Sequence, residues 1–333
     1  MSMIVRNVNE AFSTLRGYVR DLPENWREIA PRGMKTLEWR HVFITEYTHP
    51  CERVLFDPIR DANPFFHFFE ALWILAGRRD VAFLQQFNSN IASFSDDGET
   101  FHGAYGDRIK RYQACETGWG EVAQLSKAIH LLTADHDTRQ VVISIWNPSL
   151  DLGAKTKDLP CNALLMLKIR DGALNITVCC RSNDAVWGAY GANVVQFSTL
   201  QEFIARAVGV DVGTYTQVSD SFHIYVDRPD FEKNFSRVMR TDDPYTLSEV
   251  KPFPLINGTP WQEWLRQCEA FCSDVPSLNN FDKYFTHVAG PLYLAWKLHK
   301  DGSTSEALEC VEALPDGVDW KTACYRWLER RVK

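Results

Sequence analysis

Hydrophobic residues recur with a helical period in several parts of the chain. Near the N-terminus they are three or four positions apart, at Val8, Phe12, Leu15 and Val19. Spacing of this kind places them on one face of a helix. The stretches that predict helices are residues 1–30, 64–75, 193–208, 281–298 and 320–331. The chain therefore ends in two or three helices, between residues 279 and 333.

The pattern changes to alternation around Asp171-Gly172. An Asp-Gly pair between alternating apolar runs predicts a β-hairpin. On the second strand the apolar residues Leu174, Ile176 and Val178 alternate with Asn175, Thr177 and Cys179. The hairpin would place Cys161, at the start of the first strand, beside Arg181, near the end of the second.

Two further strands and one loop are expected. Residues 141–146 predict a strand, and His223-Ile224-Tyr225 predicts a strand with both polar side chains on one face. Residues 88–110 are rich in Asn, Ser, Asp and Gly, a composition that predicts a loop. Helices and strands are thus interspersed, which favours an α/β fold.

Composition narrows the class of protein. The chain has 333 residues, 45% of them hydrophobic and 24% charged, as in ordinary globular proteins. No apolar run approaches the roughly 20 residues that cross a bilayer, and no signal region is apparent. Nine cysteines without a signal peptide favour a reducing compartment, so we expect a cytoplasmic protein. Cys268 and Cys272 have no second pair at metal-binding spacing, so no metal is expected.

A net charge of -7 argues against general affinity for nucleic acid, so an anionic substrate would need a local arginine cluster. Arg181 beside Cys161 would favour the reactive thiolate, although a lone cysteine is usually a buried apolar residue. Glu70 lies within the apolar stretch 64–75. A carboxylate there is either exposed on a polar stripe or buried with a raised pKa, as a proton relay requires. Asn193 can cap the helix that follows it, or bind a ligand.

These residues, taken together, resemble a known family. The matching elements are Pro160-Cys161, Arg181-Ser182-x-Asp184, Gly188, Asn193 and His223-x-Tyr225. They are similar in kind, order and spacing to the core of the thymidylate synthase family, which transfers a one-carbon unit from 5,10-methylenetetrahydrofolate to C5 of a pyrimidine nucleotide. The similarity extends from about Arg32 to Tyr225.

The resemblance implies roles for individual residues. Cys161 would be the nucleophile, Glu70 would organise water and protons, Tyr105 would approach the reacting ring, and Asp184 would act as a base or order a loop. The substrate would be held at its phosphate, base and sugar by Arg32, Arg139, Arg181, Ser182, Asn193, His223 and Tyr225. Phe94 and Asp184 would lie near the folate. Arg139 would reach the partner's site in a homodimer.

Departures from the family pattern concern the last step of the reaction. The chain has Phe94 where methylating members have a shielding tryptophan, Asn162 where a histidine usually follows the cysteine, and no Pro-His-Pro tail. Gln140 replaces a second arginine, and one extra residue separates Gly188 from Asn193. A smaller shield should admit water, which gives a hydroxymethyl product. The helical ending could pack on the domain or replace the missing lid.

We therefore expect C5 hydroxymethylation of a pyrimidine deoxynucleotide, with dUMP favoured over dCMP because Asn193 replaces the aspartate of the cytosine-specific phage enzymes. The alternatives are a thymidylate synthase proper, a dCMP or CMP hydroxymethylase or methylase, and a non-catalytic nucleotide- or RNA-binding relative. The implied fold is α/β (α+β), with a mixed sheet surrounded by helices. Residues 1–245 would form the catalytic domain and 246–333 a helical extension. The expected setting is a bacterial or phage-infected host cytoplasm.

Overall fold

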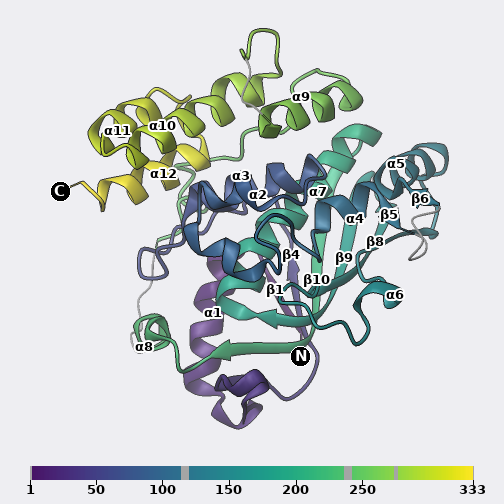
Figure 1. Ribbon diagram of the computed structural model, residues 1–333, viewed down its shortest axis with the longest axis vertical. Helices are drawn as coiled ribbons and strands as arrows, with labels where there is room; N and C mark the ends of the chain where they lie inside the picture. The colour runs from purple at the N-terminus through teal and green to yellow at the C-terminus, as the bar shows by residue number, and fades with distance from the viewer. Residues whose placement is uncertain (1, 114–119, 236–241, 274–276, 333) are drawn as a thin grey trace.

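A single mixed β-sheet forms the centre of the protein (Figure 1). The computed structural model describes residues 2–113, 120–235, 242–273 and 277–332. Within these ranges eight strands form the sheet, in the order β1-β4-β10-β9-β8-β7, with β3 beside β10 and β2 beside β3. This architecture confirms the expected mixed-sheet α/β fold.

The bounds of the elements follow the chain. The strands are β1 (Ser2–Val5), β2 (Trp26–Ile29), β3 (Thr36–Trp39), β4 (Phe43–Tyr47), β7 (Val141–Ser144), β8 (Asn162–Arg170), β9 (Ala173–Asp184), β10 (Asp211–Tyr225) and the separate pair β5 (Tyr112–Gln113) and β6 (Glu121–Val122). The helices are α1 (Val8–Asp21), α2 (Pro64–Leu75), α3 (Val81–Gln85), α4 (Tyr105–Lys110), α5 (Gln124–Ala134), α6 (Pro148–Asp151), α7 (Asn193–Val208), α8 (Pro229–Phe235), α9 (Trp261–Ser273), α10 (Gly290–Lys300), α11 (Thr304–Glu312) and α12 (Asp319–Glu329).

The predicted hairpin is present as β8 and β9. Its turn residues Asp171 and Gly172 have φ angles of 53° and 74°. Both lie in the left-handed region, which suits Asp and Gly in a tight turn. The strands pair antiparallel from Arg170 opposite Ala173 to Asn162 opposite Cys180. The alternation along β9 is as expected, because Leu174, Ile176 and Val178 are fully buried and their neighbours are partly exposed.

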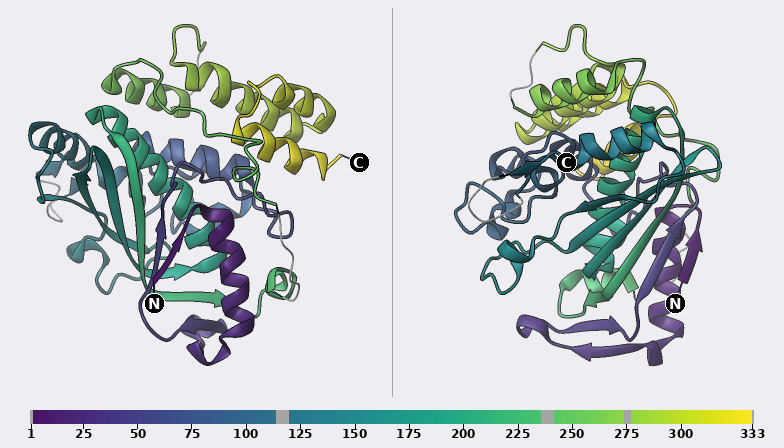
Figure 2. Two further views of the ribbon diagram at one scale, coloured as in Figure 1. Left: turned by 180° about the vertical axis from the view of Figure 1, so that it is seen from behind. Right: turned by 90° about the vertical axis from the view of Figure 1, so that its right-hand side faces the viewer.

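Helices cover one side of this sheet in two layers (Figures 1 and 2). Helix α7 contacts β9 and β10, and α2 packs on α7. The C-terminal helices lie beyond α2, which contacts both α9 and α12. Helix α7 ends at Gly209, whose φ of 86° matches a left-handed C-cap. Helices α2 and α7 therefore have the bounds that the apolar pattern predicts.

Some boundaries differ from the sequence predictions. Residues 1–30 are not one helix, because β1 and β2 flank α1. Residues 88–110 contain a short 3-10 helix and α4 rather than a loop alone. The strand expected over 141–146 stops at Ser144, and the helix expected over 281–298 divides into a π-helical turn, Phe285–Ala289, and α10. Short edge strands contain too few residues to show a period in the sequence, so tertiary packing determines where they form.

The C-terminal helices are joined to the sheet-bearing part by buried polar groups. The hydroxyl of Tyr245 donates to Asp319 on α12 at 2.7 Å and accepts from the backbone N–H of Val54 at 3.3 Å. Burial raises the pKa of Asp319 to about 7. The expected boundary near residue 245 remains a prediction. None of the helices in the described ranges combines the length and apolarity needed to cross a bilayer.

Replacing Tyr245 with Phe should weaken this junction. The change removes the partner of the buried Val54 N–H and one hydrogen bond of the Asp319 carboxyl, which still accepts from the Trp320 N–H. We expect the free energy of unfolding to fall by about 1–3 kcal/mol in urea denaturation. Tyr325→Phe, on α12, is the matched control because no hydrogen bond of its hydroxyl is seen among the described residues. Equal effects of the two substitutions would show that Tyr245 contributes through its ring alone.

Candidate active site

The β8–β9 hairpin brings Cys161 and Arg181 together, as the sequence predicts. The backbone N–H of Arg181 donates to the carbonyl of Cys161 at 2.9 Å. The guanidinium then turns back along the chain, and donates to the carbonyls of Pro160 at 2.9 Å and Leu159 at 3.2 Å. Arg181 therefore holds the backbone that precedes the cysteine and also lies near its sulfur.

Two opposing effects set the pKa of the Cys161 thiol. Burial raises the pKa of the thiol, and the nearby guanidinium of Arg181, followed by that of Arg32, only partly offsets this effect. The carboxylates of Asp158 and Asp184 act in the same direction as burial. Arg181 thus favours the thiolate but does not outweigh desolvation, and the resting residue is a thiol. The expected direction of the Arg181 effect is confirmed, and the larger effect of burial is one that the sequence does not show.

A cavity of about 260 Å³ lies near Cys161, and Asp158 and Tyr105, which interact electrostatically with that residue, are part of its lining. Its lining includes four predicted site residues, Glu70, Phe94, Tyr105 and Asn193. All of its lining residues lie between Glu70 and Gln196, so none comes from the C-terminal helices. This arrangement favours a packing role for those helices over their replacing the missing lid. Phe94 is half exposed at the cavity.

The carboxyl of Glu70 has a pKa near neutral. Its position on α2 is enclosed, and burial raises the pKa of its carboxyl to about 7, while a hydrogen bond from Gln196 opposes the increase. Its Oε2 atom is buried and finds no hydrogen-bond partner among the described residues. This confirms the interpretation of Glu70 as a buried carboxyl rather than an exposed one. A group that titrates near neutral pH can both accept and donate a proton there.

The side-chain amides of Asn162, Asn193 and Asn183 form a hydrogen-bonded chain beside the cavity, which we call the amide chain. Asn162 donates from Nδ2 to the hydroxyl of Tyr105 at 3.2 Å and to Oδ1 of Asn193 at 3.3 Å. Asn193 donates from Nδ2 to Oδ1 of Asn183 at 3.0 Å, and Asn183 donates to Ser219 at 2.9 Å. Asn193 makes no capping hydrogen bond to its own helix, so the capping alternative was wrong. The sequence analysis did not assign roles to Asn162 and Asn183.

The remaining polar residues lie on two adjacent strands. Parallel pairing of β9 with β10 places His223 opposite Asp184, and Ser221 opposite Ser182. Burial raises the pKa of Asp184, and His223 and Arg228 partly offset this. Asp184 accepts from the backbone N–H groups of Val186 and Trp187 at 2.8 and 2.6 Å, which orders the turn before α7. Of its two expected roles, loop ordering is the one that these contacts show.

Tyr225 and Arg32 complete this side of the site. The Tyr225 ring packs edge-on against His223. Burial raises the pKa of its hydroxyl, Asp184 acts in the same direction, and Arg228 and Arg32 oppose the increase. Arg32 is exposed in a turn with φ of 55°, an unusual angle for a residue with a side chain. That turn lies against the end of β10, because the Val226 N–H donates to Lys35 at 3.1 Å. Arg32 is therefore near Tyr225 and Cys161.

Arg139 is the predicted site residue that lies apart. It is exposed just before β7, whose first residue, Val141, pairs with Leu167. Leu167 is six residues along from Cys161, a distance of about 20 Å on an extended strand. Arg139 therefore lies near the hairpin turn, far from the nucleophile of its own chain.

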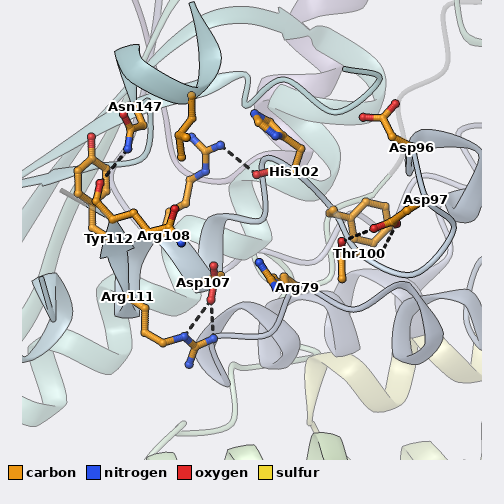
Figure 3. Close-up of a pocket in the computed structure, with 13 residues that line it drawn as sticks. Arg79, Asp96, Asp97, Thr100, His102, Asp107, Arg108, Arg111, Tyr112 and Asn147 are labelled. Atoms are coloured by element: carbon orange, nitrogen blue, oxygen red, sulfur yellow. Dashed lines mark hydrogen bonds and ion pairs between the residues drawn. The ribbon is translucent and has the colours of Figure 1, made fainter. Parts of the chain in front are cut away.

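A second, more polar pocket of about 360 Å³ adjoins the first and shares Phe101 with it (Figure 3). Its arginines are largely neutralised by their neighbours. Arg111 donates to Asp107 at 2.9 Å, and Arg108 donates to Asp151 at 2.8 Å and to the His102 carbonyl at 2.9 Å. These contacts hold α4, the helix that begins at Tyr105, against the segment that precedes it. The pocket contains none of the predicted site residues.

Comparison with known proteins places the chain in a family. Residues 64–252 match the family model for thymidylate synthase. The chain belongs to the thymidylate synthase family. The matched segment contains the nucleophile hairpin, Glu70 and the β10 strand, which are the parts that form the site.

Two phage relatives match over a longer range than the family model. A deoxyuridylate hydroxymethyltransferase of Pseudomonas phage M6 is 42% identical over 298 residues, which cover 86% of this chain and 83% of the relative. A second protein of that name, from Bacillus phage SP01, is 43% identical over 274 residues, covering 78% and 71%. A putative thymidylate synthase of Methanocaldococcus jannaschii is 40% identical over 115 residues, covering 34% and 51%.

Replacing Glu70 with Gln should stabilise the protein at high pH. The folded-state pKa of about 7 lies above the ordinary 4.5, so between these values the unfolded chain releases the proton first. Stability is therefore lost across that window, and the loss persists above it. We expect Glu70→Gln to match the wild type below pH 4.5 and to gain about 1–3 kcal/mol above pH 7.

The measurement is denaturant unfolding at several pH values. The exposed Glu329 supplies a control, because Glu329→Gln should leave the pH dependence unchanged. A gain from Glu70→Gln that is equal at pH 4 and pH 8 would contradict a raised pKa at this site.

Proposed function

We propose that this protein transfers a hydroxymethyl group to C5 of dUMP, with methylenetetrahydrofolate as the one-carbon donor. The observation that carries the proposal is the cavity between Glu70 and Asn193, with Cys161 and Arg181 beside it. Its support from comparison is the identity of 42–43% over most of the chain to phage proteins named deoxyuridylate hydroxymethyltransferase.

Cys161 acts first. Its sulfur adds to C6 of the pyrimidine, which makes C5 nucleophilic enough to take up the one-carbon unit. Because the resting group is a thiol, its proton must leave as the S–C bond forms. Glu70, with a pKa of about 7, is a suitable proton acceptor and donor for the water and the carbonyl at O4 of the base. Tyr105 lines the same cavity as Glu70, and its hydroxyl accepts a hydrogen bond from Asn162.

The substrate is held at three points. Arg32, Arg181 and Ser182 bind the phosphate, since guanidinium groups pair with phosphate oxygens in two-pronged contacts. His223 and Tyr225 contact the sugar from the end of β10. Asn193 binds the base, because one amide offers a donor and an acceptor to match uracil N3 and O4.

Folate fits the surface beside Asp184. Trp187 is 47% exposed there, and its ring lies 4.2 Å from the guanidinium of Arg60 and 6.0 Å from that of Arg228. A flat, anionic molecule can stack on such an aromatic ring and pair with the arginines. Asp184 would bind the polar ring of the folate, which supplies the one-carbon unit. Phe94 would contact it from the opposite side of the cavity.

Water rather than hydride completes the reaction. Once the folate has left, the ring carries an exocyclic methylene, and water adding to it gives the hydroxymethyl group as Cys161 departs. The half-exposed Phe94 ring covers less of the cavity than a tryptophan would, so water can reach this carbon. A methyl product, as in thymidylate synthase proper, is the second candidate, favoured by the family match itself.

The active form is a homodimer in this proposal. The face of the sheet away from α7 includes Val142 and Met166, which pair across β7 and β8 and are 51% and 42% exposed. A second copy covering this face would bury them. It would also bring Arg139 to the partner's phosphate site, which that arginine cannot reach in its own chain. The free thiols of the eight described cysteines suit a reducing cytoplasm.

Replacing Cys161 with Ala should abolish turnover and leave nucleotide binding intact. The variant lacks the nucleophile but retains the arginines and Asn193. The assay incubates protein with dUMP or dCMP and methylenetetrahydrofolate, identifies the product by mass spectrometry and follows dihydrofolate absorbance. The wild-type protein should give hydroxymethyl-dUMP without dihydrofolate, and Cys161→Ala should give no product. Cys310→Ala, on α11, is the matched control and should keep full turnover.

The product distinguishes the candidate functions. A methyl product with one dihydrofolate per turnover would establish a thymidylate synthase, and faster turnover of dCMP would move the substrate to cytosine. Unchanged activity in Cys161→Ala would eliminate the covalent mechanism.

Mixing two inactive variants should restore activity if Arg139 acts across the dimer. Each site would use Cys161 of one chain and Arg139 of the other. A mixed dimer of Arg139→Ala and Cys161→Ala therefore contains one site in which both residues are intact. Random exchange of subunits then gives about one quarter of wild-type activity. The control mixture of Cys161→Ala with Asn193→Ala should remain inactive, because both residues come from one chain. No recovery in the first mixture would show that Arg139 does not serve the partner.

A further inference from the structure

The amide chain has a defined direction, because Asn162 donates to Asn193 and Asn193 donates to Asn183. The side chains of Asn162, Asn193 and Asn183 are all less than one-tenth exposed. We propose that Asn162 and Asn183 fix the orientation of the Asn193 amide, and that this orientation makes the enzyme select uracil over cytosine. The inference rests on the proposed function, in which Asn193 contacts the base.

Orientation matters because the two pyrimidines have opposite polarity at the same two positions. Uracil presents an N–H at N3 and a carbonyl at position 4. Cytosine presents a bare nitrogen at N3 and an amino group at position 4. The base is held in one place by the bond to Cys161 and by the sugar and phosphate contacts. An amide that cannot turn over therefore matches one base and opposes the other.

The ends of the amide chain do not fix its direction. Tyr105 and Ser219 are hydroxyl groups, and a hydroxyl can donate or accept. All three amides could therefore turn over together, and each contact between them would be kept with donor and acceptor exchanged. Another feature must distinguish the two directions.

Asn162 supplies that feature. In the observed direction its Nδ2 uses both N–H bonds, one to Tyr105 and one to Asn193. Its Oδ1 is buried and has no partner within the described residues. In the inverted direction Oδ1 would accept both contacts, and two buried N–H groups would be left unpaired. An unpaired buried N–H is rarer in proteins than an under-used carbonyl oxygen, so the observed direction is favoured.

Gly188 keeps the other end of the chain in contact. A Cβ at this position would lie 2.8 Å from Oδ1 of Asn183 and 3.3 Å from Nδ2 of Asn193. Both distances are shorter than ordinary contacts, so a larger residue would push the two amides apart. The glycine therefore allows Asn183 to receive the hydrogen bond that holds Asn193.

Two isosteric substitutions test the inference. In Asn162→Asp the carboxylate can only accept, so Asn193 must turn its Nδ2 toward it, and Asn183 and Ser219 can follow. In Asn183→Asp the carboxylate accepts from Nδ2 of Asn193 as the amide oxygen does now, so Asn193 keeps its direction. Each variant adds one negative charge next to Asn193, which makes them a matched pair.

The measured quantity is the ratio of kcat/KM for dUMP to that for dCMP. A ratio is needed because a carboxylate next to Cys161 will slow both reactions. We expect Asn162→Asp to lower the ratio by about tenfold or more, and Asn183→Asp to keep it within about threefold of wild type. The same ratio of nucleotide dissociation constants, measured without folate, should change in parallel.

Gly188→Ala supplies an independent variant that adds no charge. It separates Asn183 from Asn193, so the ratio should decrease toward one while the fold, followed by thermal unfolding, is retained. Equal changes of the ratio in the two Asp variants, or wild-type ratios in all three, would overturn the inference. Failure of the proposed function is visible separately, because the wild-type protein would then show no preference for dUMP or would not act on it.

Discussion

The pairing of β8 with β9 is the constraint on which the site depends. The N–H of Arg181 bonds to the carbonyl of Cys161, so the distance between nucleophile and guanidinium is set by a backbone ladder. A shift of one residue would turn the buried row of Leu174, Ile176 and Val178 toward the other face. Burial of that row therefore holds the catalytic register. Strand β10, parallel to β9, positions His223 and Tyr225, the proposed sugar contacts, in the same way.

Burial also sets the acid–base chemistry of the site. Desolvation raises the pKa of Cys161, Glu70 and Asp184 alike, and in each case it exceeds the effect of the neighbouring cations or donors. Desolvation therefore disfavours the charged form of each of these groups. A smaller negative charge at the site favours the entry of an anionic nucleotide. Proton transfer then accompanies bond formation.

Helix α7 links the site to the C-terminal helices. It begins with Asn193 and carries Gln196 one turn later, both at the cavity. Further along, Glu202 forms a buried ion pair with Arg53 at 2.6 Å and accepts from the N–H of Leu255 at 3.0 Å. The extension therefore supports the helix that carries Asn193, the proposed contact to the base, although none of its residues lines the cavity.

Local sequence patterns were enough to predict the elements with a strong period and the residues with distinctive chemistry. Helices α2 and α7, the hairpin at Asp171-Gly172, and the proximity of Cys161 to Arg181 follow from such patterns, because period and turn type are properties of neighbouring residues. The pKa of Cys161 emerged only from the packed structure, since desolvation depends on atoms distant in the chain. The tertiary structure also decided the direction of the amide chain through Asn162, Asn193 and Asn183, because three asparagines become one hydrogen-bonded unit only after β8, β9 and α7 have packed together.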